Sequence, residues 1–448
     1  MRSYEHTHTA DLSASLSCSA AVADRAPGQA AHGGHAFTPM DAERAGDIPA
    51  SFRDMMRRLL ERREFSAIVA VANDLLADHP DSLYLHFALG TAHSNLEQNR
   101  QCIRHCRRFL EIQAQPHERS FKRANLTGIQ NNLALALKEL GMLTGAGDAF
   151  RSLLQVAPNY VPALVNYGNL LNETARLEEA REHFARAIEI DPEDHLAYWN
   201  LHSTANDADT ARAILEICLS KNPKNELAIM TLAGLHAFAG DRSHIEALAH
   251  DGFADDPIIR SIEWILSRNE TPQIHFNRWS MFDTALAHAN QSRAFYEFGV
   301  WMGDSFRYLI DHFPQGYGFD TFEGLPEEWH GLPRGSYTSF GEVPNILGAE
   351  FVVGEFRNTL PEFFAHERPM AGLINFDADL YSSTITALNH ARPVIDSSTV
   401  LVFDEFIVNK NWEHDEFRAL EEFCATNGLR YEVLAVSLFT KQMACRLR

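Results

Sequence analysis

Cysteine and positive charge are scarce in this sequence, and long apolar runs are absent. Its 448 residues include six cysteines with no C-x-x-C pair, which excludes a disulfide framework and the common spacing of zinc sites. No stretch approaches 18 consecutive apolar residues, so we expect no membrane-spanning helix. Asp and Glu outnumber Lys and Arg by 60 to 39, and the net charge of −21 argues against nucleic acid or an anionic membrane surface as a partner.

The chain is too long for one compact core, so we expect several domains. Residues 1–48 are rich in Ala, Ser, Gly and His without a helical or strand period, which predicts a disordered tail. Metal binding by its histidines is the less favoured alternative to a tail without function; these are His6, His8, His32 and His35. Since no basic cluster precedes an apolar run, we expect no secretion signal and a cytoplasmic protein with free thiols.

A helical repeat is predicted for residues 49–257, where prolines close successive units. The prolines stand at 80, 158, 192, 223 and 257, with spacings of 78, 34, 31 and 34. In the clearest unit the repeat positions are held by Leu164, Tyr167, Gly168, Leu171, Ala180, Phe184, Ala187 and Pro192. This unit resembles the tetratricopeptide repeat, in which small residues let two helices approach and an aromatic residue fills the gap. Cys102 and Cys106 hold equivalent positions in an earlier unit beside Gly90, so we interpret them as packing residues.

Beyond a helical linker predicted for residues 258–290, short apolar runs alternate with helical patterns across residues 291–448. We expect strands at 294–300, 316–320, 350–354, 371–377 and 399–404, with helices at 303–313, 357–366, 383–395 and 413–426. This alternation predicts a Rossmann-like α/β domain, with a parallel sheet covered on both faces. The last two apolar runs, 431–438 and 442–448, are so close that only an antiparallel hairpin can join them.

Acidic residues and glycines end the predicted strands, where ligands bind in open α/β sheets. Glu297, Gly299 and Gly303 form the turn after the first strand, and Asp320 ends the second. Glu297 stands where dinucleotide-binding motifs have their first glycine, and its carboxylate would repel a pyrophosphate. S-adenosylmethionine suits this acidic set better, because it carries an amine, a sulfonium and a ribose that Asp320 can bind. The alternative is a plain turn with a solvated acid.

Five segments in order, EFGVWMGDS, GFDTFEGLPEEW, GEFRNTLP, FDADLYSST and VFDEF, resemble the motifs of class I S-adenosylmethionine-dependent methyltransferases. Within that class they resemble the macrocin O-methyltransferase family, whose characterised members methylate sugar hydroxyls and often self-associate. The resemblance covers about Ile274 to Arg448. It implies that the cofactor is bound by Glu297, Gly299, Gly303, Asp320, Gly354, Glu355 and Asp377. It further implies Mg²⁺ held by Asp377, Asp404 and Glu405, with Asp379 as the general base.

The residues themselves also favour a cation at this place. The fourth and fifth strands are expected to be neighbours, so their acidic ends converge and raise one another's pKa values. Hard oxygen ligands suit Mg²⁺. Asp377 and Asp379, two residues apart, are expected on one side of the strand. Glu405 departs from the aspartate usual in the family and lengthens that arm. The structural alternative, helix-capping acids, fits Asp379 best.

The long connection 321–349 is predicted to be a lid or binding loop, in which Trp329, His330 and Tyr337 contact substrate or serve loop packing. Together the motifs predict a cytoplasmic, metal-assisted O-methyltransferase acting on a sugar, glycan or glycosylated metabolite. The repeats would dock a protein partner or the acceptor. One alternative keeps the chemistry but uses a phenolic, peptide or protein acceptor. The other is a non-catalytic tetratricopeptide scaffold with a degenerate methyltransferase domain.

Overall fold

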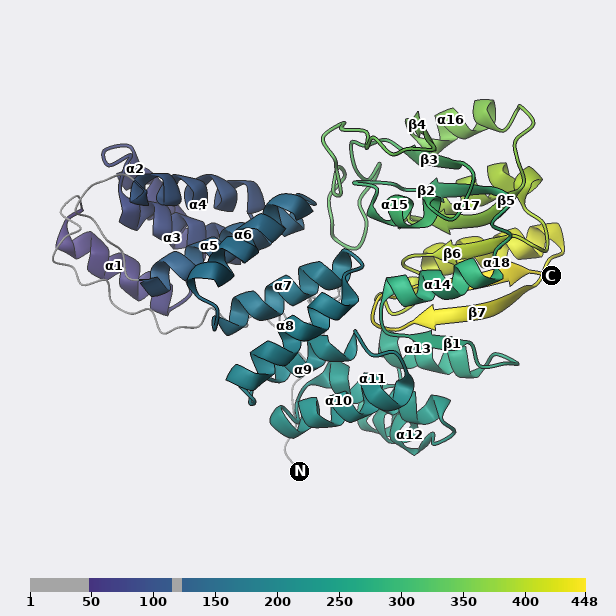
Figure 1. Ribbon diagram of the computed structural model, residues 1–448, viewed down its shortest axis with the longest axis horizontal. Helices are drawn as coiled ribbons and strands as arrows, with labels where there is room; N and C mark the ends of the chain where they lie inside the picture. Colours follow the sequence, from purple (N-terminus) through teal and green to yellow (C-terminus); the bar gives the residue numbers. More distant parts are fainter. Residues whose placement is uncertain (1–47, 115–122) are drawn as a thin grey trace. The chain divides into compact units, whose positions relative to one another are not determined.

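The computed structural model describes residues 48–114 and 123–448 (Figure 1). The histidines of the predicted tail, and the tail itself apart from Ile48, lie outside the described residues. Within the described ranges, no helix combines the length and the apolar character needed to cross a bilayer. The described chain divides into two compact units: residues 48–173 with 178–192, and residues 174–177 with 193–448.

The first unit consists of helices joined as antiparallel pairs. Its helices are α1 (Ala50–Glu61), α2 (Phe65–Leu76), α3 (Leu83–Asn95), α4 (Asn99–Gln113), α5 (Arg123–Glu139), α6 (Leu143–Val156), α7 (Val161–Glu173) and α8 (Leu177–Ile190). A Cβ atom on Gly168 would lie 2.5 Å from the Phe184 ring, so only glycine lets α7 and α8 approach this closely. Gly90 and Cys106 make the equivalent contact between α3 and α4, because a Cβ atom added to Gly90 would lie 3.0 Å from Cys106 Sγ. The packing interpretation of these residues is confirmed.

The second unit begins inside the predicted repeat region. Its first helices are α9 (His195–His202), α10 (Ala208–Lys221), α11 (Glu226–Phe238), α12 (Ser243–Leu248), a π-helical turn at Ala249–Phe253, and α13 (Pro257–Leu266). The Trp199 ring of α9 lies 5.7 Å from the Phe439 ring in the final hairpin. The Asn277 amide donates to the Ser203 carbonyl at 3.0 Å. These helices therefore share cores with the sheet unit, although the sequence analysis assigns α9–α12 to the repeats and α13 to the linker.

The sheet of the second unit has eight strands in the order β1-β7-β8-β6-β5-β2-β3-β4. Its strands are β1 (Gln273–His275), β2 (Ala294–Phe298), β3 (Gly316–Asp320), β4 (Ala349–Val353), β5 (Ala371–Phe376), β6 (Val400–Phe403), β7 (Tyr431–Ser437) and β8 (Met443–Leu447). β8 is antiparallel to β6 and β7, and the other pairs are parallel. The predicted α/β layout, with a terminal hairpin, is confirmed. β1 was not predicted.

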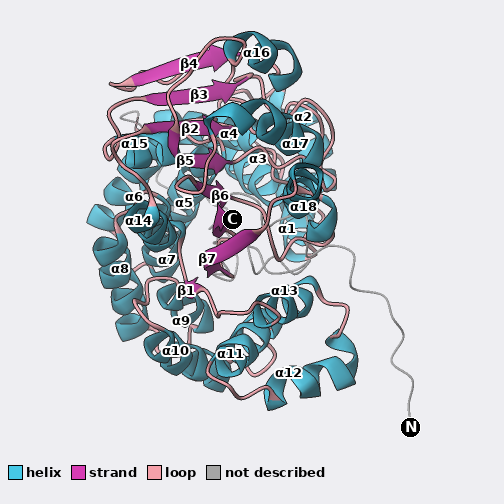
Figure 2. Cartoon of the chain, turned by 90° about the vertical axis from the view of Figure 1, so that its right-hand side faces the viewer, coloured by secondary structure: helices cyan, strands magenta, loops and turns pink. Residues whose placement is uncertain are grey.

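Helices cover both faces of this sheet. Figure 2 shows α14 (Arg278–His288) and α15 (Asp304–Ile310) on one side of the strands, and α17 (Tyr381–Ala391) and α18 (Glu416–Asn427) on the other. α16 (Phe356–Phe363) joins the second group, because Leu360 and Phe363 pack in the same cluster as α17 and α18. The central strands β2, β3, β5 and β6 are consequently buried on both faces, which explains their nearly continuous apolar sequences, whereas the edge strands β1 and β4 are partly exposed.

Four phenylalanines, one from each central strand, form a row across the face covered by α16–α18. Phe298 stacks on Phe319 at 4.8 Å and on Phe376 at 5.4 Å between ring centroids. Phe376 stacks in turn on Phe403 at 4.8 Å. All four are fully buried and directly opposed in the strand register. Phe298, Phe376 and Phe403 are the last residues of their strands, and Phe319 is the last but one of β3, so the four strands end at nearly the same level.

The close approach of α7 and α8 gives a stability prediction with a matched control. Gly168→Ala should lower the free energy of unfolding of the helical unit by about 1–3 kcal/mol, because the new methyl group overlaps the Phe184 ring. Gly128→Ala, in α5, should instead stabilise it by up to about 1 kcal/mol, since nothing lies within 4 Å of its added Cβ. Chemical denaturation followed by circular dichroism tests both; equal effects would contradict the packing argument.

Candidate functional site

The candidate site lies at the carboxyl ends of the central strands, where the phenylalanine row ends. Each phenylalanine is followed directly by a predicted site residue, and these are Gly299, Asp320, Asp377 and Asp404. Because the four strands are parallel and in register, their next residues gather at one edge of the sheet. The local fold thus brings together residues that lie up to about a hundred positions apart in the chain.

The glycine turn after β2 is held closed by Asp320. One carboxylate oxygen of Asp320 accepts hydrogen bonds from the backbone N–H groups of Val300 at 2.7 Å and Trp301 at 2.8 Å. Its other oxygen accepts from the N–H group of Phe322 at 2.7 Å. Asp320 therefore has a structural role that the sequence did not indicate, and its contact with a ribose stays a prediction.

Gly299 is required by a close backbone approach between two strand ends. Its φ is +92°, and an added Cβ would lie 1.8 Å from the carbonyl oxygen of Asp377. Gly303, with φ +78°, precedes α15, and Gly354, with φ +139°, donates its N–H to the Asp320 carbonyl at 2.9 Å. Glu355 lies at the start of α16 and forms an ion pair with Arg357.

Glu297 is buried in β2 rather than open to solvent. The Asn375 side-chain amide donates to Glu297 Oε1 at 2.7 Å, whereas Oε2 has no hydrogen-bond partner among the described residues. Burial raises the pKa of Glu297 to about 8, although the Ser305 hydroxyl and the Asn375 amide act in the opposite direction. At neutral pH this carboxyl is therefore mostly protonated and uncharged. Its predicted contact with a cofactor stays a prediction.

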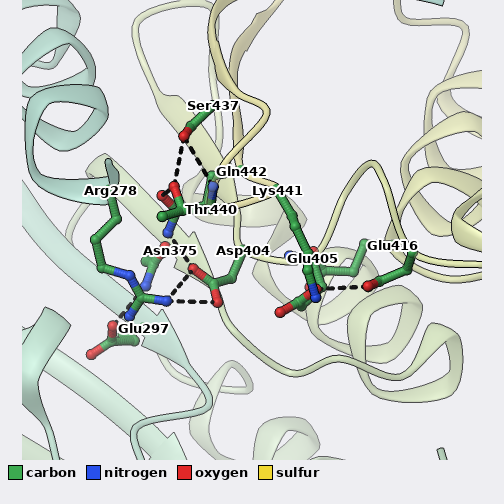
Figure 3. Close-up of polar contacts among 11 residues, drawn as sticks. Arg278, Glu297, Asn375, Asp404, Glu405, Glu416, Ser437, Thr440, Lys441 and Gln442 are labelled. Atoms are coloured by element: carbon green, nitrogen blue, oxygen red, sulfur yellow. Dashed lines mark hydrogen bonds and ion pairs between the residues drawn. The ribbon is translucent and has the colours of Figure 1, made fainter. Parts of the chain in front are cut away.

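Asp404, at the end of β6, is bound by two side chains that the sequence analysis did not identify. The Arg278 guanidinium lies 3.2 Å from Oδ1 and 3.1 Å from Oδ2 (Figure 3). The Gln442 amide also donates to Oδ1. Arg278 begins α14 and Gln442 precedes β8, so both reach Asp404 from distant parts of the chain.

Glu405, the next residue, opposes a buried lysine. Lys441 Nζ lies 3.0 Å from Glu405 Oε2, and the two side chains are only 3% and 6% exposed. The Asn409 amide donates to the same oxygen at 2.6 Å. The backbone N–H of Glu405 donates to the carboxylate of Glu416 at 3.1 Å. Burial raises the pKa of Glu405, and the Lys441 charge acts in the opposite direction.

Further carboxyl groups surround this pair. Burial, followed by the charge of Asp404, raises the pKa of Asp377 well above its ordinary value. The pKa of Asp379 is also raised, first by burial and then by the charge of Glu405. The pKa of Glu416 is raised first by burial and then by the charge of Asp379. Asp379 lies beyond the end of β5 with φ +59°, so the predicted alternation with Asp377 along a strand is wrong. The two are nevertheless close enough for Asp379 to affect the pKa of Asp377.

The predicted Mg²⁺ ligands do not form a ready-made metal centre. In residues 48–114 and 123–448, the one group of three ligand atoms that lie within 4.8 Å of one another is His236, Asp241 and His244. Asp377, Asp404 and Glu405 are not such a group, and protein cations contact two of them. Mg²⁺ needs carboxylate oxygens about 2.0–2.1 Å from one point. The arrangement therefore does not fit the ion, and magnesium stays a prediction of the resemblance.

The long loop between β3 and β4 is anchored beside Asp379. Trp329 is buried with Leu325 and Leu380, the residue after Asp379. His330 Nε2 lies 2.7 Å from a carboxylate oxygen of Asp415, just before α18. The ring of Tyr337 lies 6.1 Å from that of Trp301 in the glycine turn. These contacts give all three predicted residues a packing role, and their contact with substrate stays a prediction.

Four site residues were missed by the sequence analysis: Arg278, Glu416, Lys441 and Gln442. None of them directly follows a predicted parallel strand, and none is among the residues that the family resemblance implies. Lys441 lies in the short turn between the last two predicted strands, and Arg278 lies in the predicted linker. Their common feature is that tertiary packing alone brings them to the acidic edge.

Comparisons with known proteins identify the helical repeats and leave the sheet unit unassigned. A family model described as tetratricopeptide repeat matches residues 137–204, so the chain contains this repeat. No curated protein matches the chain.

Solved structures that resemble parts of the chain include repeat proteins and methyltransferases. The tetratricopeptide protein YrrB, with an unusual peptide-binding site, is 17% identical, with a TM-score of 0.33 over 42% of this chain and 92% of its own. The O-methyltransferase NovP is 16% identical and has a TM-score of 0.31, and the match covers 38% of this chain and 80% of NovP. The calicheamicin methyltransferase CalS11 is 20% identical and has a TM-score of 0.28, and the match covers 48% of this chain and 91% of CalS11. Similarities of this size do not define an activity.

The burial of Glu297 predicts a pH dependence of stability. The pKa of Glu297 is about 8 in the folded protein and 4.5 for an unperturbed glutamate. A carboxyl with such a raised pKa stabilises the fold at pH values below 4.5, and this stabilisation is lost as the pH rises toward about 8. Glu297→Gln keeps a neutral side chain of the same shape, so its stability relative to the wild type should increase by a few kcal/mol from pH 5 to pH 8.

Urea denaturation of both proteins at the two pH values measures this difference. Glu350→Gln is the matched control, because Glu350 is an exposed carboxylate on β4, the edge strand of the same sheet. A stability difference between Glu297→Gln and wild type that stays constant with pH would show that Glu297 is charged in the fold.

Proposed function

We propose that the sheet unit is an S-adenosylmethionine-dependent methyltransferase with an oxygen acceptor, and that the tetratricopeptide repeats bind a protein partner or position the acceptor. The observation that carries the proposal is the arrangement at the sheet edge. A turn that only Gly299 can form meets Asp377, and carboxyl groups exceed cations around it. A cationic cofactor with an amine and a sulfonium suits this surplus of negative charge.

The proposed chemistry uses Asp379 as the base. The acceptor oxygen forms a bond to the methyl carbon while the bond from that carbon to sulfur breaks, and the hydroxyl proton passes to the Asp379 carboxylate. Burial and the charge of Glu405 raise the pKa of Asp379 and so increase its affinity for a proton. A cationic cofactor bound beside Asp379 would favour the carboxylate form that the reaction needs. The loop anchored by Trp329 and His330 would exclude water from the reacting groups.

The acceptor class in this proposal is a hydroxyl of a sugar, glycan or glycosylated metabolite. A phenolic, peptide or protein acceptor is the alternative within the same chemistry, and a scaffold without activity is the alternative outside it. Mg²⁺ has no step in the proposed reaction, because Arg278 and Lys441 contact two of its three predicted ligands. Self-association and a cytoplasmic location stay predictions.

Cofactor binding separates the enzyme from the scaffold. Isothermal titration calorimetry of the full chain with S-adenosylmethionine and with S-adenosylhomocysteine should give one site per chain. Sinefungin, which carries an amine at the position of the sulfonium, serves as a third probe of the preference for positive charge. Absence of binding by all three would reject the methyltransferase and leave the scaffold.

Removal of the proposed base should abolish transfer but not cofactor binding. Asp379→Asn keeps the shape and tolerates the positive φ, yet it cannot accept the proton, so transfer should fall about 10²–10⁴-fold. Transfer of a labelled methyl group into metabolite and glycan extracts, with mass spectrometry of the products, measures the loss. Asp311→Asn, at an exposed position after α15, is the control. Unchanged transfer in Asp379→Asn would exclude this base.

A further inference from the structure

Lys441 contacts Glu405, one of the three residues that the family resemblance implies as metal ligands. We propose that methyl transfer at this site needs no divalent metal, and that the Lys441 ammonium supplies the positive charge opposite Asp379 and Glu405. This inference rests on the methyltransferase proposed above and specifies how its acceptor end is stabilised.

The position of Lys441 is built into the fold. The residue lies in the turn between β7 and β8 with φ +64°, and its carbonyl accepts the N–H of Ile407 at 3.2 Å. This backbone contact ties the turn to the segment directly after Glu405. The side chain is 3% exposed and reaches the Glu405 carboxylate, as Figure 3 shows. A lysine this buried is rare unless it opposes a carboxylate.

The carboxylate oxygens that would coordinate an ion are already in contact with protein donors. Glu405 Oε2 has Lys441 Nζ at 3.0 Å and the Asn409 amide at 2.6 Å. Asp404 has the Arg278 guanidinium on both oxygens and Gln442 on one. An ion bound to these oxygens would lie beside two positive groups, the Arg278 guanidinium and the Lys441 ammonium. Coulomb repulsion at such distances inside a protein opposes that arrangement.

The ammonium of Lys441 also has hydrogen-bonding capacity left over. Although Nζ lies at ion-pair distance from Glu405, it makes no hydrogen bond of good geometry to any described residue. A buried ammonium carries three donors. The charge of Lys441 also acts on Asp379. An acceptor oxygen that reached both residues would receive a hydrogen bond from Lys441 and lose its proton to Asp379. In this arrangement Lys441 provides the charge that a metal ion provides elsewhere.

Two measurements on the full chain test the metal independence directly. Transfer should be unchanged after EDTA treatment and dialysis, and addition of Mg²⁺ should have no effect. Mn²⁺ titration followed by electron paramagnetic resonance should find no ion at the acidic edge in the His244→Ala variant, which lacks the other close ligand group. Loss of activity with EDTA that Mg²⁺ restores, or one bound Mn²⁺ that Asp377→Ala removes, would overturn the inference.

Substitution of Lys441 tests its role. Lys441→Met should lower kcat at least tenfold while the affinity for S-adenosylmethionine stays within about twofold, and Lys441→Arg should restore part of kcat. Lys410→Met, at an exposed position after β6, is the control with normal activity. A Lys441→Met variant that binds cofactor and keeps full kcat would contradict this inference but not the proposed function. Failure of the wild type to bind cofactor would instead reject the proposed function.

An independent observation points to a metal site elsewhere in this unit. We infer that His236, Asp241 and His244, around the turn between α11 and α12, bind a transition-metal ion such as Zn²⁺. Their three ligand atoms lie within 4.8 Å of one another, and the two imidazole rings stack at 4.7 Å. Two imidazoles and one carboxylate, with a further position open to solvent, form a common zinc ligand set.

The Asp241 carboxylate is oriented as metal ligands usually are. Its Oδ1 accepts hydrogen bonds from the Ser243 N–H at 3.0 Å and the Ser243 hydroxyl at 2.6 Å. Its Oδ2 lies 3.9 Å from His244 Nε2, facing the imidazole. The Asp241 N–H donates to the His236 carbonyl at 2.9 Å, which fixes the turn between two of the ligands. One oxygen is thus held by the chain and the other is directed toward the histidines.

Calorimetric titration of the full chain with Zn²⁺ tests this site. We expect one ion per chain, at least tenfold weaker binding in His244→Ala, and no binding of Mg²⁺ at these residues. His250→Ala, which removes an exposed histidine from the following π-helical turn, should bind Zn²⁺ like the wild type. Equal affinity in the wild type and His244→Ala, or absence of binding in the wild type, would contradict the inference.

Discussion

The stacked row of Phe319, Phe298, Phe376 and Phe403 is the constraint on which the candidate site depends. Each ring lies in the register pair of its neighbour, with interplanar angles of 11–16°. This stacking fixes the height at which four strands end, and the residue after each ring is therefore delivered to one edge of the sheet. A shift of any strand by one residue would turn its phenylalanine to the other face and separate the site residues.

The same edge concentrates carboxyl groups in a buried environment, and this charge requires compensation. The chain provides it in two ways. Arg278 and Lys441 neutralise Asp404 and Glu405 directly, whereas burial raises the pKa values of Asp377, Asp379 and Glu416, which favours their protonated forms. A ligand that brings its own positive charge would reverse part of this protonation. The part of the edge formed by Asp377 and Asp379 is therefore suited to a cationic organic ligand, which is the physical basis of the proposed cofactor.

Much of this arrangement could be predicted from the sequence, because its signals are local. The period of the apolar runs placed the strands, and the spacing of Gly168 and Phe184 placed a repeat. Lys441 and Arg278 could not be predicted, since Arg278 is 126 residues from the carboxylate it binds. Asp320 was found but given only a ligand role, because backbone hydrogen bonds to a side chain leave no sequence pattern. The helical repeat was likewise extended to Pro257, although its last helices share a core with the sheet.

That shared core has a consequence for how the chain can be divided in evolution or in the laboratory. Trp199, Phe276 and Phe439 come from a repeat helix, from the segment after β1 and from the final hairpin, and they meet in one apolar cluster. A truncation at Pro257, where the predicted repeats end, would expose Phe276 and Phe439 to water and favour aggregation. A chimaera that replaces the helical repeats by another solenoid would expose the same apolar cluster unless the junction lies before residue 193. The sheet unit and the last helices of the array thus form one packing unit, which a fusion or truncation has to keep together.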